Sequence, residues 1–248
     1  MDRITVAALQ QMKRERRKIV GVVVYDYQMA RIADRGRVDL VSVGDSVGVN
    51  MWGHQHESDV TLGEMLIACK AVRRGVSRAV VSCDLPEASE DLVSAARTLA
   101  TEGGADMVKV ETEASTVQAI VRAGVAVWAQ LSGQISGQSA VGSGQEFAGL
   151  IERAKALEAA GASMLDFRHS GPVAGPAVAG AVSIPVIGGL GGGPWLDGRV
   201  RAIVNAIGYS AAALDDNADR YANVARVALD AITSYADDVR GGRQVRGK

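Results

Sequence analysis

Short apolar runs alternate with amphipathic segments along almost the whole chain. The runs are typical of buried parallel strands, the last being the weakest, and they cover residues 19–24, 38–43, 79–83, 107–110, 125–130, 163–167, 184–187 and 202–204. Between them, apolar positions recur at helical spacing, as in residues 61–75, where Thr61 and Glu64 match a capping box. Strands that alternate with helices predict an α/β parallel sheet, most economically a closed (β/α)8 TIM barrel.

The helical segments complete this barrel pattern. Thr5 is placed to cap a short helix that runs through Met12, and further helices are expected at residues 28–34, 89–101, 115–123, 146–160 and 217–238. We therefore predict one barrel domain over residues 1–248, with a short N-terminal helix and closing C-terminal helices. Residues 132–144 are rich in Gly, Ser and Gln, which is typical of a mobile lid or of a flexible crossover.

Three of the predicted strands end in an acidic residue. Asp45, Asp84 and Glu111 each follow the apolar run of a separate strand. Because the carboxyl ends of parallel strands meet at one mouth of a barrel, we expect an oxygen-rich site there that suits Mg²⁺. Acidic residues after strands also serve as helix caps and turn formers, but three in consecutive strand-helix units favour the metal site.

Two further residues beside these carboxylates suit an anionic substrate. Ser46 follows Asp45 directly, and Lys109 lies two residues before Glu111 on the same face of the strand. His54 and His56 are spaced like metal ligands, but no third and fourth ligand stands nearby, so a loop that contacts substrate or a neighbour is favoured.

Composition excludes several classes of protein. The 248 residues suit a single barrel, and 27 basic against 28 acidic residues leave no global field for nucleic acid or an anionic membrane. The first residues lack the apolar core of a signal, and no segment has the apolar length of a membrane span. We expect a soluble cytoplasmic protein in which Cys69 and Cys83 are packed thiols.

The order of several short motifs resembles the ketopantoate hydroxymethyltransferase family over nearly the entire chain. The motifs are residues 19–27, Gly44-Asp45-Ser46-Val47-Gly48, Val60-Thr61, residues 70–75, Asp84-Leu85-Pro86, Val108-Lys109-Val110-Glu111, Ile184-Pro185-Val186-Ile187-Gly188 and Asp197-Gly198. This family belongs to the phosphoenolpyruvate/pyruvate barrel superfamily. It transfers a hydroxymethyl group from 5,10-methylenetetrahydrofolate to 2-oxoisovalerate.

The resemblance implies roles for the residues at the strand ends. Asp45 and Asp84 would hold Mg²⁺, Glu111 would support it through water, and Ser46 and Lys109 would bind the carboxylate of a 2-oxo acid. A 2-oxo acid chelates Mg²⁺ through its carboxylate and ketone oxygens, so the metal would stabilise the enolate that forms when a proton leaves C3. The resemblance also implies a homo-oligomer, with the C-terminal helices at its contacts.

The chain departs from the family where the reacting carbon would lie. Arg168 stands in the place of the glutamate that removes the proton, and Gln130 replaces a histidine that belongs with the substrate-binding residues. An arginine is not a base at neutral pH, and His169 is the nearest substitute. Alternatively, Arg168 binds a second carboxylate or a phosphate, or simply pairs with Asp166 on the same strand face.

These departures leave three hypotheses open. The first is a magnesium-dependent, divergent hydroxymethyltransferase that acts on a 2-oxo acid through an enolate, with Lys109 and either Arg168 or His169 as its catalytic side chains. The second is a carbon-carbon lyase or a phosphonomutase-like enzyme of the same superfamily, and the third is a non-catalytic paralogue. Dependence of product formation on methylenetetrahydrofolate separates the first from the second.

Overall fold

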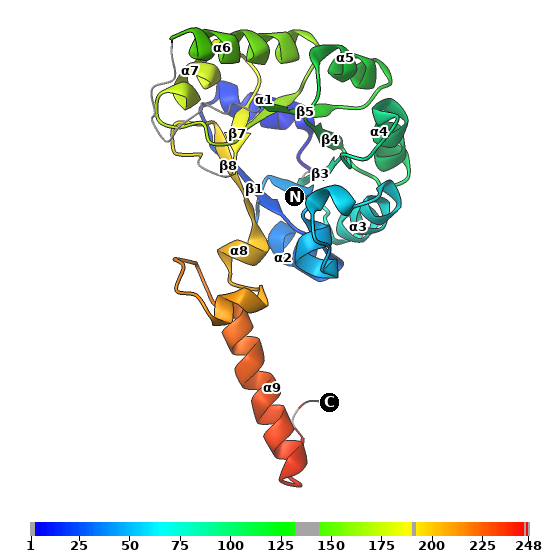
Figure 1. The fold of residues 1–248 in the computed structure, drawn as a ribbon, viewed down its shortest axis with the longest axis vertical. Helices are drawn as coiled ribbons and strands as arrows, with labels where there is room; N and C mark the ends of the chain where they lie inside the picture. Colours follow the sequence, from blue (N-terminus) through cyan, green and yellow to red (C-terminus); the bar gives the residue numbers. More distant parts are fainter. Residues whose placement is uncertain (1–2, 132–143, 190–191, 246, 248) are drawn as a thin grey trace. The chain divides into compact units, whose positions relative to one another are not determined.

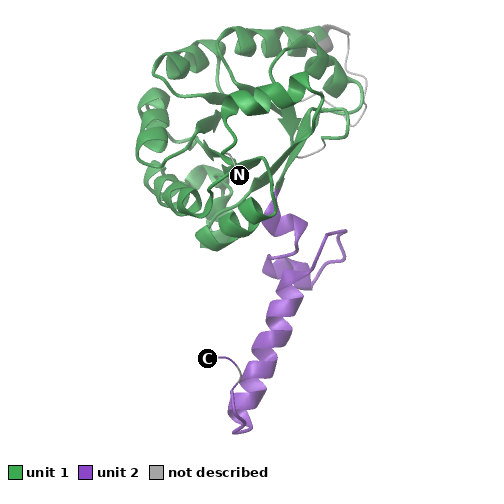
Figure 2. Cartoon of the chain, turned by 180° about the vertical axis from the view of Figure 1, so that it is seen from behind, with its two compact units in different colours: residues 1–201 green, residues 202–248 purple. Residues whose placement is uncertain are grey.

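The computed structural model describes residues 3–131, 144–189, 192–245 and 247, with the side chains of residues 144–147 left aside. It divides into two compact units, residues 1–201 and residues 202–248 (Figure 2). The segment of residues 132–143, predicted as a lid or crossover, lies outside the described residues.

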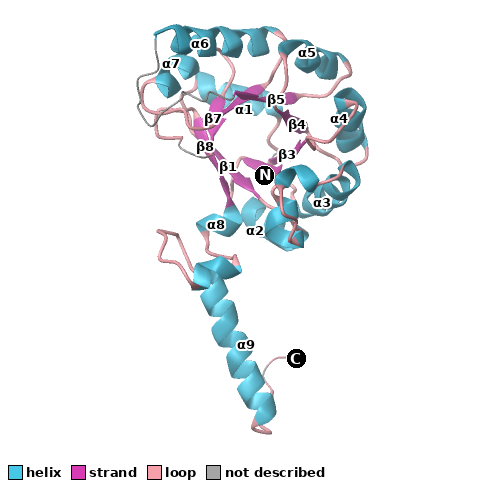
Figure 3. Cartoon of the chain, in the orientation of Figure 1, coloured by secondary structure: helices cyan, strands magenta, loops and turns pink. Residues whose placement is uncertain are grey.

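Eight parallel strands form a closed barrel in sequence order, and helices surround it (Figures 1 and 3). The predicted (β/α)8 fold is therefore confirmed. The strands are β1 (Ile19–Val23), β2 (Leu40–Val43), β3 (Val80–Asp84), β4 (Met107–Val110), β5 (Val127–Leu131), β6 (Met164–Phe167), β7 (Val186–Gly188) and β8 (Gly198–Ala202).

The position predicted for the eighth strand was wrong. Gly198–Ala202 forms β8, and residues 203–204 of the predicted run begin a short helix, α8 (Ile203–Ala206). The true strand alternates buried residues with the exposed Arg199 and Arg201, so it has no continuous apolar run. An apolar-run criterion misses a strand that is buried on one face only.

The helices of the first unit lie close to their predicted positions. They are α1 (Val6–Arg14), α2 (Tyr27–Arg35), α3 (Leu62–Gly75), α4 (Leu92–Thr101), α5 (Ala114–Arg122), α6 (Gly144–Ala159) and α7 (Ala174–Ala181), of which α7 was not predicted. Thr5 caps α1, and Thr61 and Glu64 form the predicted capping box of α3. Cys69 and Cys83 are free and buried, as expected.

The second unit contains three helical elements. These are α8, a 3-10 turn over Ala211–Leu214 and α9 (Val224–Arg240), so the closing helix begins later than residue 217. The role of these helices in oligomer contacts stays a prediction. Among the described residues, no helix combines the length and the apolar character that crossing a bilayer requires.

Helix α1 packs against the amino-terminal end of the barrel. Leu9 and Met12 join a buried cluster with the first residues of β2, β3 and β4, which are Leu40, Val80 and Met107. Trp128 of β5 lies in the same cluster and is fully buried. This end is thus filled by apolar side chains, and the site must lie at the carboxyl end.

Two glycines allow β1 and β8 to meet and close the barrel. The backbone N–H of Ile19 donates to the carbonyl oxygen of Asp197 at 3.0 Å. A Cβ atom on Gly198 would lie 2.2 Å from the carbonyl oxygen of Ile19, and one on Gly21 would lie 3.2 Å from the Cβ of Val200. A side chain at Gly198 therefore has no room without backbone movement.

Carboxylates at the amino-terminal end of the barrel hold strand backbones. Asp34 accepts from the N–H groups of Ser77, Arg78 and Ala79 at 3.0, 3.1 and 2.9 Å. Asp197 likewise accepts from the N–H of Val186 at 2.8 Å. These acidic residues are structural, because their oxygens satisfy backbone donors beside the strands.

We expect Gly198→Ala to lower the free energy of unfolding by roughly 1–3 kcal/mol, because the added methyl group must push β8 away from β1. Urea unfolding followed by circular dichroism measures this change. Gly149→Ala, in α6 with open space around its Cβ position, is the matched control and should raise stability by up to about 1 kcal/mol. A urea midpoint of Gly198→Ala at or above that of the wild type would contradict the close contact between β1 and β8 at Gly198.

Candidate active site

A polar cavity of about 370 Å³ lies at the carboxyl ends of the strands. Five of its lining residues carry carboxylates and two carry positive charges. Its lining is Asp45, Glu57, Asp84, Leu85, Pro86, Glu87, Ser89, Leu92, Lys109, Val110, Glu111, Gln130 and Arg168. The structure thus brings together most of the site residues predicted from the sequence.

A buried ion pair occupies the centre of this lining. Lys109 Nζ lies 2.6 Å from Asp84 Oδ2, and the two residues are neighbours in the register of β3 and β4. Both are almost inaccessible, at 7% and 4% exposure. The ammonium also lies 5.5 Å from the ring centroid of Trp128. Burial alone would lower the pKa of Lys109, but the Asp84 and Asp166 carboxylates raise it, so the lysine is charged.

Asp84 still has one oxygen without a partner. Its Oδ1 is buried and receives no hydrogen bond from the described residues. A buried carboxylate oxygen without a donor is costly, since buried polar atoms in folded proteins are nearly always bonded. The unpaired oxygen therefore points to a ligand.

Asp45 lies beside Asp84 in the same cavity. Burial, and then the negative charge of Asp84, raise the pKa of Asp45 to about 6. Burial and the neighbouring carboxylate thus disfavour the ionised form of Asp45. A bound cation would favour that form.

The hydroxyl group of Ser46 is held by Tyr25, which follows β1. Its Oγ lies 2.9 Å from the hydroxyl oxygen of Tyr25, which also accepts from Asn50 Nδ2 at 3.3 Å. Burial raises the pKa of Tyr25, so the phenol keeps its proton. Ser46 itself is not among the residues that line the cavity, although a Cβ on Gly44 would lie 3.0 Å from Ser46 Oγ and 3.9 Å from Asp84 Oδ2.

Glu111 and Gln130 form a second polar pair at the cavity. Gln130 Nε2 donates to Glu111 Oε2 at 2.6 Å. Glu111 is exposed, unlike Asp84. No group of three or more acidic, histidine or cysteine side chains in the described part of the chain is arranged to hold a metal by itself. A direct metal site built on Asp45 and Asp84 would therefore also need ligand and water oxygens.

Arg168 and His169 have different surroundings. Strand β6 ends at Phe167, and Arg168 lines the cavity while its Nε contacts Asp166 Oδ2 at 3.3 Å. The pairing with Asp166 expected from the sequence is thus present. His169 is exposed, has a φ of 52°, and is not part of the cavity lining. The structure does not bring it to the other site residues.

Two carboxylates in the lining were not assigned a catalytic, substrate-binding or metal-binding role from the sequence. Glu57 comes from the long loop after β2, and Glu87 from the loop after β3. The strand pattern gives no signal for them, because loop paths decide their positions. His54 Nε2 lies 3.4 Å from a carboxylate oxygen of Glu64.

The donor set fits a hard divalent cation. Asp45 and Asp84 supply only oxygen, and one buried oxygen of Asp84 has no donor among the described residues. Mg²⁺ typically takes one or two protein carboxylates and completes its octahedron with water and substrate oxygens. Asp45 and Asp84 are two such carboxylates in the lining of one cavity.

Comparisons with known proteins agree on family and fold. A family model described as Ketopantoate hydroxymethyltransferase matches residues 3–244. A 3-methyl-2-oxobutanoate hydroxymethyltransferase of Pelobacter propionicus is 32% identical over 97% of this chain and 94% of its own length. One from Prosthecochloris aestuarii is 35% identical over 98% and 94%.

A solved structure with this fold also matches nearly the whole chain. It is a phosphonopyruvate hydrolase in complex with oxalate and Mg²⁺, with a TM-score of 0.64 and 14% sequence identity. The match covers 97% of this chain and 88% of the hydrolase. At this identity the likeness concerns the fold.

We expect Asp45→Asn to stabilise the metal-free protein at neutral and higher pH. The pKa of Asp45 is raised from 3.8 to about 6, so the folded state holds this proton more tightly than the unfolded chain does. Ionisation in the folded state therefore costs stability, and that cost is complete above about pH 6 and absent below about pH 4. In EDTA at about pH 8, the free energy of unfolding should rise by roughly 1–3 kcal/mol.

Asp34→Asn is the matched control at the opposite end of the barrel. Burial works to raise the pKa of Asp34, but hydrogen bonds from Ala79 and Ser77 outweigh it and lower the pKa. The ionised group thus stabilises the fold, and its substitution should cost roughly 1–3 kcal/mol at about pH 8. Urea titrations at two pH values measure both variants. A lower free energy of unfolding for Asp45→Asn at high pH would mean that the Asp45 carboxylate stabilises the folded protein.

Proposed function

The chain belongs to the ketopantoate hydroxymethyltransferase family, and we propose that it is a magnesium-dependent hydroxymethyltransferase that acts on a 2-oxo acid. Its one-carbon donor in this proposal is 5,10-methylenetetrahydrofolate. The observation that carries the proposal is the unpartnered Oδ1 of Asp84, buried in a cavity that Asp45 and Lys109 also line. That combination suits a cation and an anionic chelating ligand together.

Asp45 and Asp84 are the residues that would hold Mg²⁺. When bound, the ion would act as a Lewis acid toward the 2-oxo acid and stabilise negative charge on its ketone oxygen. The phosphonopyruvate hydrolase of the same fold was solved with Mg²⁺ and oxalate, which supports this assignment by analogy. Glu111 would act from a greater distance, through water.

Lys109 and Ser46 would bind the substrate carboxylate. The ammonium of Lys109 is charged and buried, so it provides a strong partner for a carboxylate that enters the cavity. Tyr25 fixes the hydroxyl of Ser46 through the 2.9 Å contact between their oxygens. A small 2-oxo acid would thus be oriented with its carboxylate toward these groups and C3 toward the open side.

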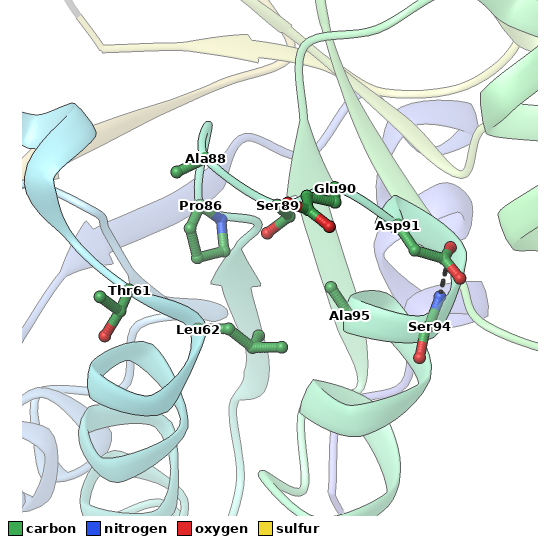
Figure 4. A pocket seen from close by; sticks show the side chains of 9 residues that line it. All are labelled: Thr61, Leu62, Pro86, Ala88, Ser89, Glu90, Asp91, Ser94 and Ala95. Atoms are coloured by element: carbon green, nitrogen blue, oxygen red, sulfur yellow. Dashed lines mark hydrogen bonds between the residues drawn. The ribbon is translucent and has the colours of Figure 1, made fainter.

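A second pocket neighbours the acidic cavity. It has a volume of about 360 Å³, and Pro86 and Ser89 line both it and the acidic cavity (Figure 4). Ser89 Oγ is buried and has no partner among the described residues. We assign this pocket to the part of methylenetetrahydrofolate that does not react, with the one-carbon group directed past Ser89.

Arg168 favours a second candidate function, a carbon-carbon lyase or phosphonomutase-like enzyme. Its guanidinium lines the cavity and keeps its proton, so it cannot take a proton from C3. His169 is exposed and outside the lining, which gives no support to its role as the substitute base. A different side chain at position 168 can change the reaction at C3, while the residues proposed to bind the metal and the substrate carboxylate stay the same.

We expect the protein to exchange the C3 proton of 2-oxoisovalerate with deuterium oxide when Mg²⁺ is present. Asp84→Asn should slow this exchange at least about 100-fold, a change of about 2.7 kcal/mol, because the carboxylate that holds the cation loses its charge. Proton NMR of the C3 signal measures the rate. Asp45→Asn should slow it similarly although the fold is expected to be more stable.

Asp26→Asn is the matched control for this experiment. Asp26 also follows a barrel strand, but it caps α2 through Gln28 and Met29, and asparagine caps helices equally well. Its exchange rate should equal that of the wild type. Absence of exchange with every 2-oxo acid tried would argue against enolisation. Product formation without methylenetetrahydrofolate would favour the lyase.

A further inference from the structure

Arg168 uses only one part of its guanidinium within the described structure. Its Nε contacts Asp166 Oδ2 at 3.3 Å, and no hydrogen bond joins its two terminal nitrogens to any described residue. About a third of the side chain, 35%, is exposed, and it lines the acidic cavity. A guanidinium whose only task was to neutralise Asp166 would present its fork to that carboxylate.

Asp166 anchors this guanidinium from inside the barrel. Its side chain is 3% exposed, and its Oδ1 has no partner among the described residues. Asp166 of β6 is paired in register with Gln130 of β5, and the Gln130 side chain donates to Glu111. The aspartate therefore holds the guanidinium through Nε and leaves its terminal nitrogens without a partner among the described residues, in a side chain that lines the cavity.

The charges around the cavity restrict where an anion can bind. Glu57, Glu87 and Glu111 repel any carboxylate that approaches their walls. Lys109 already has a carboxylate partner at 2.6 Å and, in the proposed function, also binds the carboxylate next to the ketone. Arg168 is the remaining cation of the described lining.

We infer that Arg168 binds a second anionic group of the substrate, so that the preferred substrate is a 2-oxo acid with a carboxylate or phosphonate at its other end. Both groups have the paired oxygens that a guanidinium binds with two parallel hydrogen bonds. Asp166 is a positioning residue for this contact. The inference rests on the proposed function, because the first carboxylate and the ketone must already be held at Lys109 and the cation.

An uncharged side chain on the substrate would be disfavoured at the same place. It would displace water from the terminal nitrogens of Arg168 and offer no acceptor in return. Sites that bind a polar group reject analogues without that group more strongly than apolar pockets reject small changes in size. Arg168 is thus a specificity-determining residue at the position where the family has the glutamate that removes the proton.

The test compares substrate analogues of nearly equal size by isothermal titration calorimetry with Mg²⁺. The monoanionic probe is 2-oxobutanoate, and the dianionic probes are oxaloacetate and phosphonopyruvate. In the wild type we expect an affinity ratio of about ten or more in favour of at least one dianion over 2-oxobutanoate. The dianion that binds more tightly shows whether the second group of the substrate is a carboxylate or a phosphonate. Arg168→Gln should abolish this ratio.

Further variants separate positioning from structural damage. Arg168→Lys should keep part of the ratio, because a single charge remains, and Asp166→Asn should reduce it while 2-oxobutanoate still binds. Arg122→Gln, an exposed arginine at the end of α5, is the control for loss of one positive charge and should keep the full ratio.

Two results would overturn the inference. The first is a wild-type protein that binds all three probes with equal affinity. The second is a preference for the dianion over 2-oxobutanoate that persists in Arg168→Gln. Either outcome leaves the proposed function standing. Absence of Mg²⁺-dependent binding for every probe would instead overturn the proposed function, and the inference with it.

Discussion

The buried pair of Lys109 and Asp84 is the interaction on which the cavity depends. Removing two charges from water is costly, and a 2.6 Å contact offsets that cost only when the remaining polar atoms find partners. Asp84 Oδ1 has none among the described residues. A pair kept under these conditions is better explained by ligand binding than by stability, because apolar residues of similar size would usually serve the fold as well.

The two ends of the barrel use acidic residues in opposite ways. At the amino-terminal end, Asp34 and Asp197 accept hydrogen bonds from strand backbones and so hold the fold together. At the carboxyl-terminal end, Asp45 has a raised pKa, and Asp84 and Asp166 each have a buried oxygen without a partner among the described residues. The same residue type thus stabilises one end and leaves the other short of positive charge. This difference locates the site without reference to any relative.

Much of this could be predicted from the sequence because strand ends carry the site. Asp45, Asp84, Lys109 and Glu111 follow apolar runs, and a parallel barrel brings such positions to one mouth. Strand β8 was misplaced because Arg199 and Arg201 interrupt its apolar pattern.

Other features depend on tertiary structure that no local pattern encodes. Helix α7 was missed because its Ala-Gly-Pro-Ala-Val-Ala-Gly-Ala sequence has no polar face. The positions of Glu57 and Glu87, and the support of Ser46 by Tyr25, depend on loop paths. The exposure of His169 follows from the chain turning just after β6, with a φ of 52° at that residue.

Direct titration with Mn²⁺, followed by electron paramagnetic resonance of the free ion, tests the central claim that Asp45 and Asp84 hold a divalent cation together. We expect the wild-type protein with 2-oxobutanoate to bind Mn²⁺, Asp45→Asn and Asp84→Asn each to lose this binding, and Asp26→Asn to keep it. Mn²⁺ affinity that is unchanged in both cavity variants would show that these two carboxylates do not hold the cation.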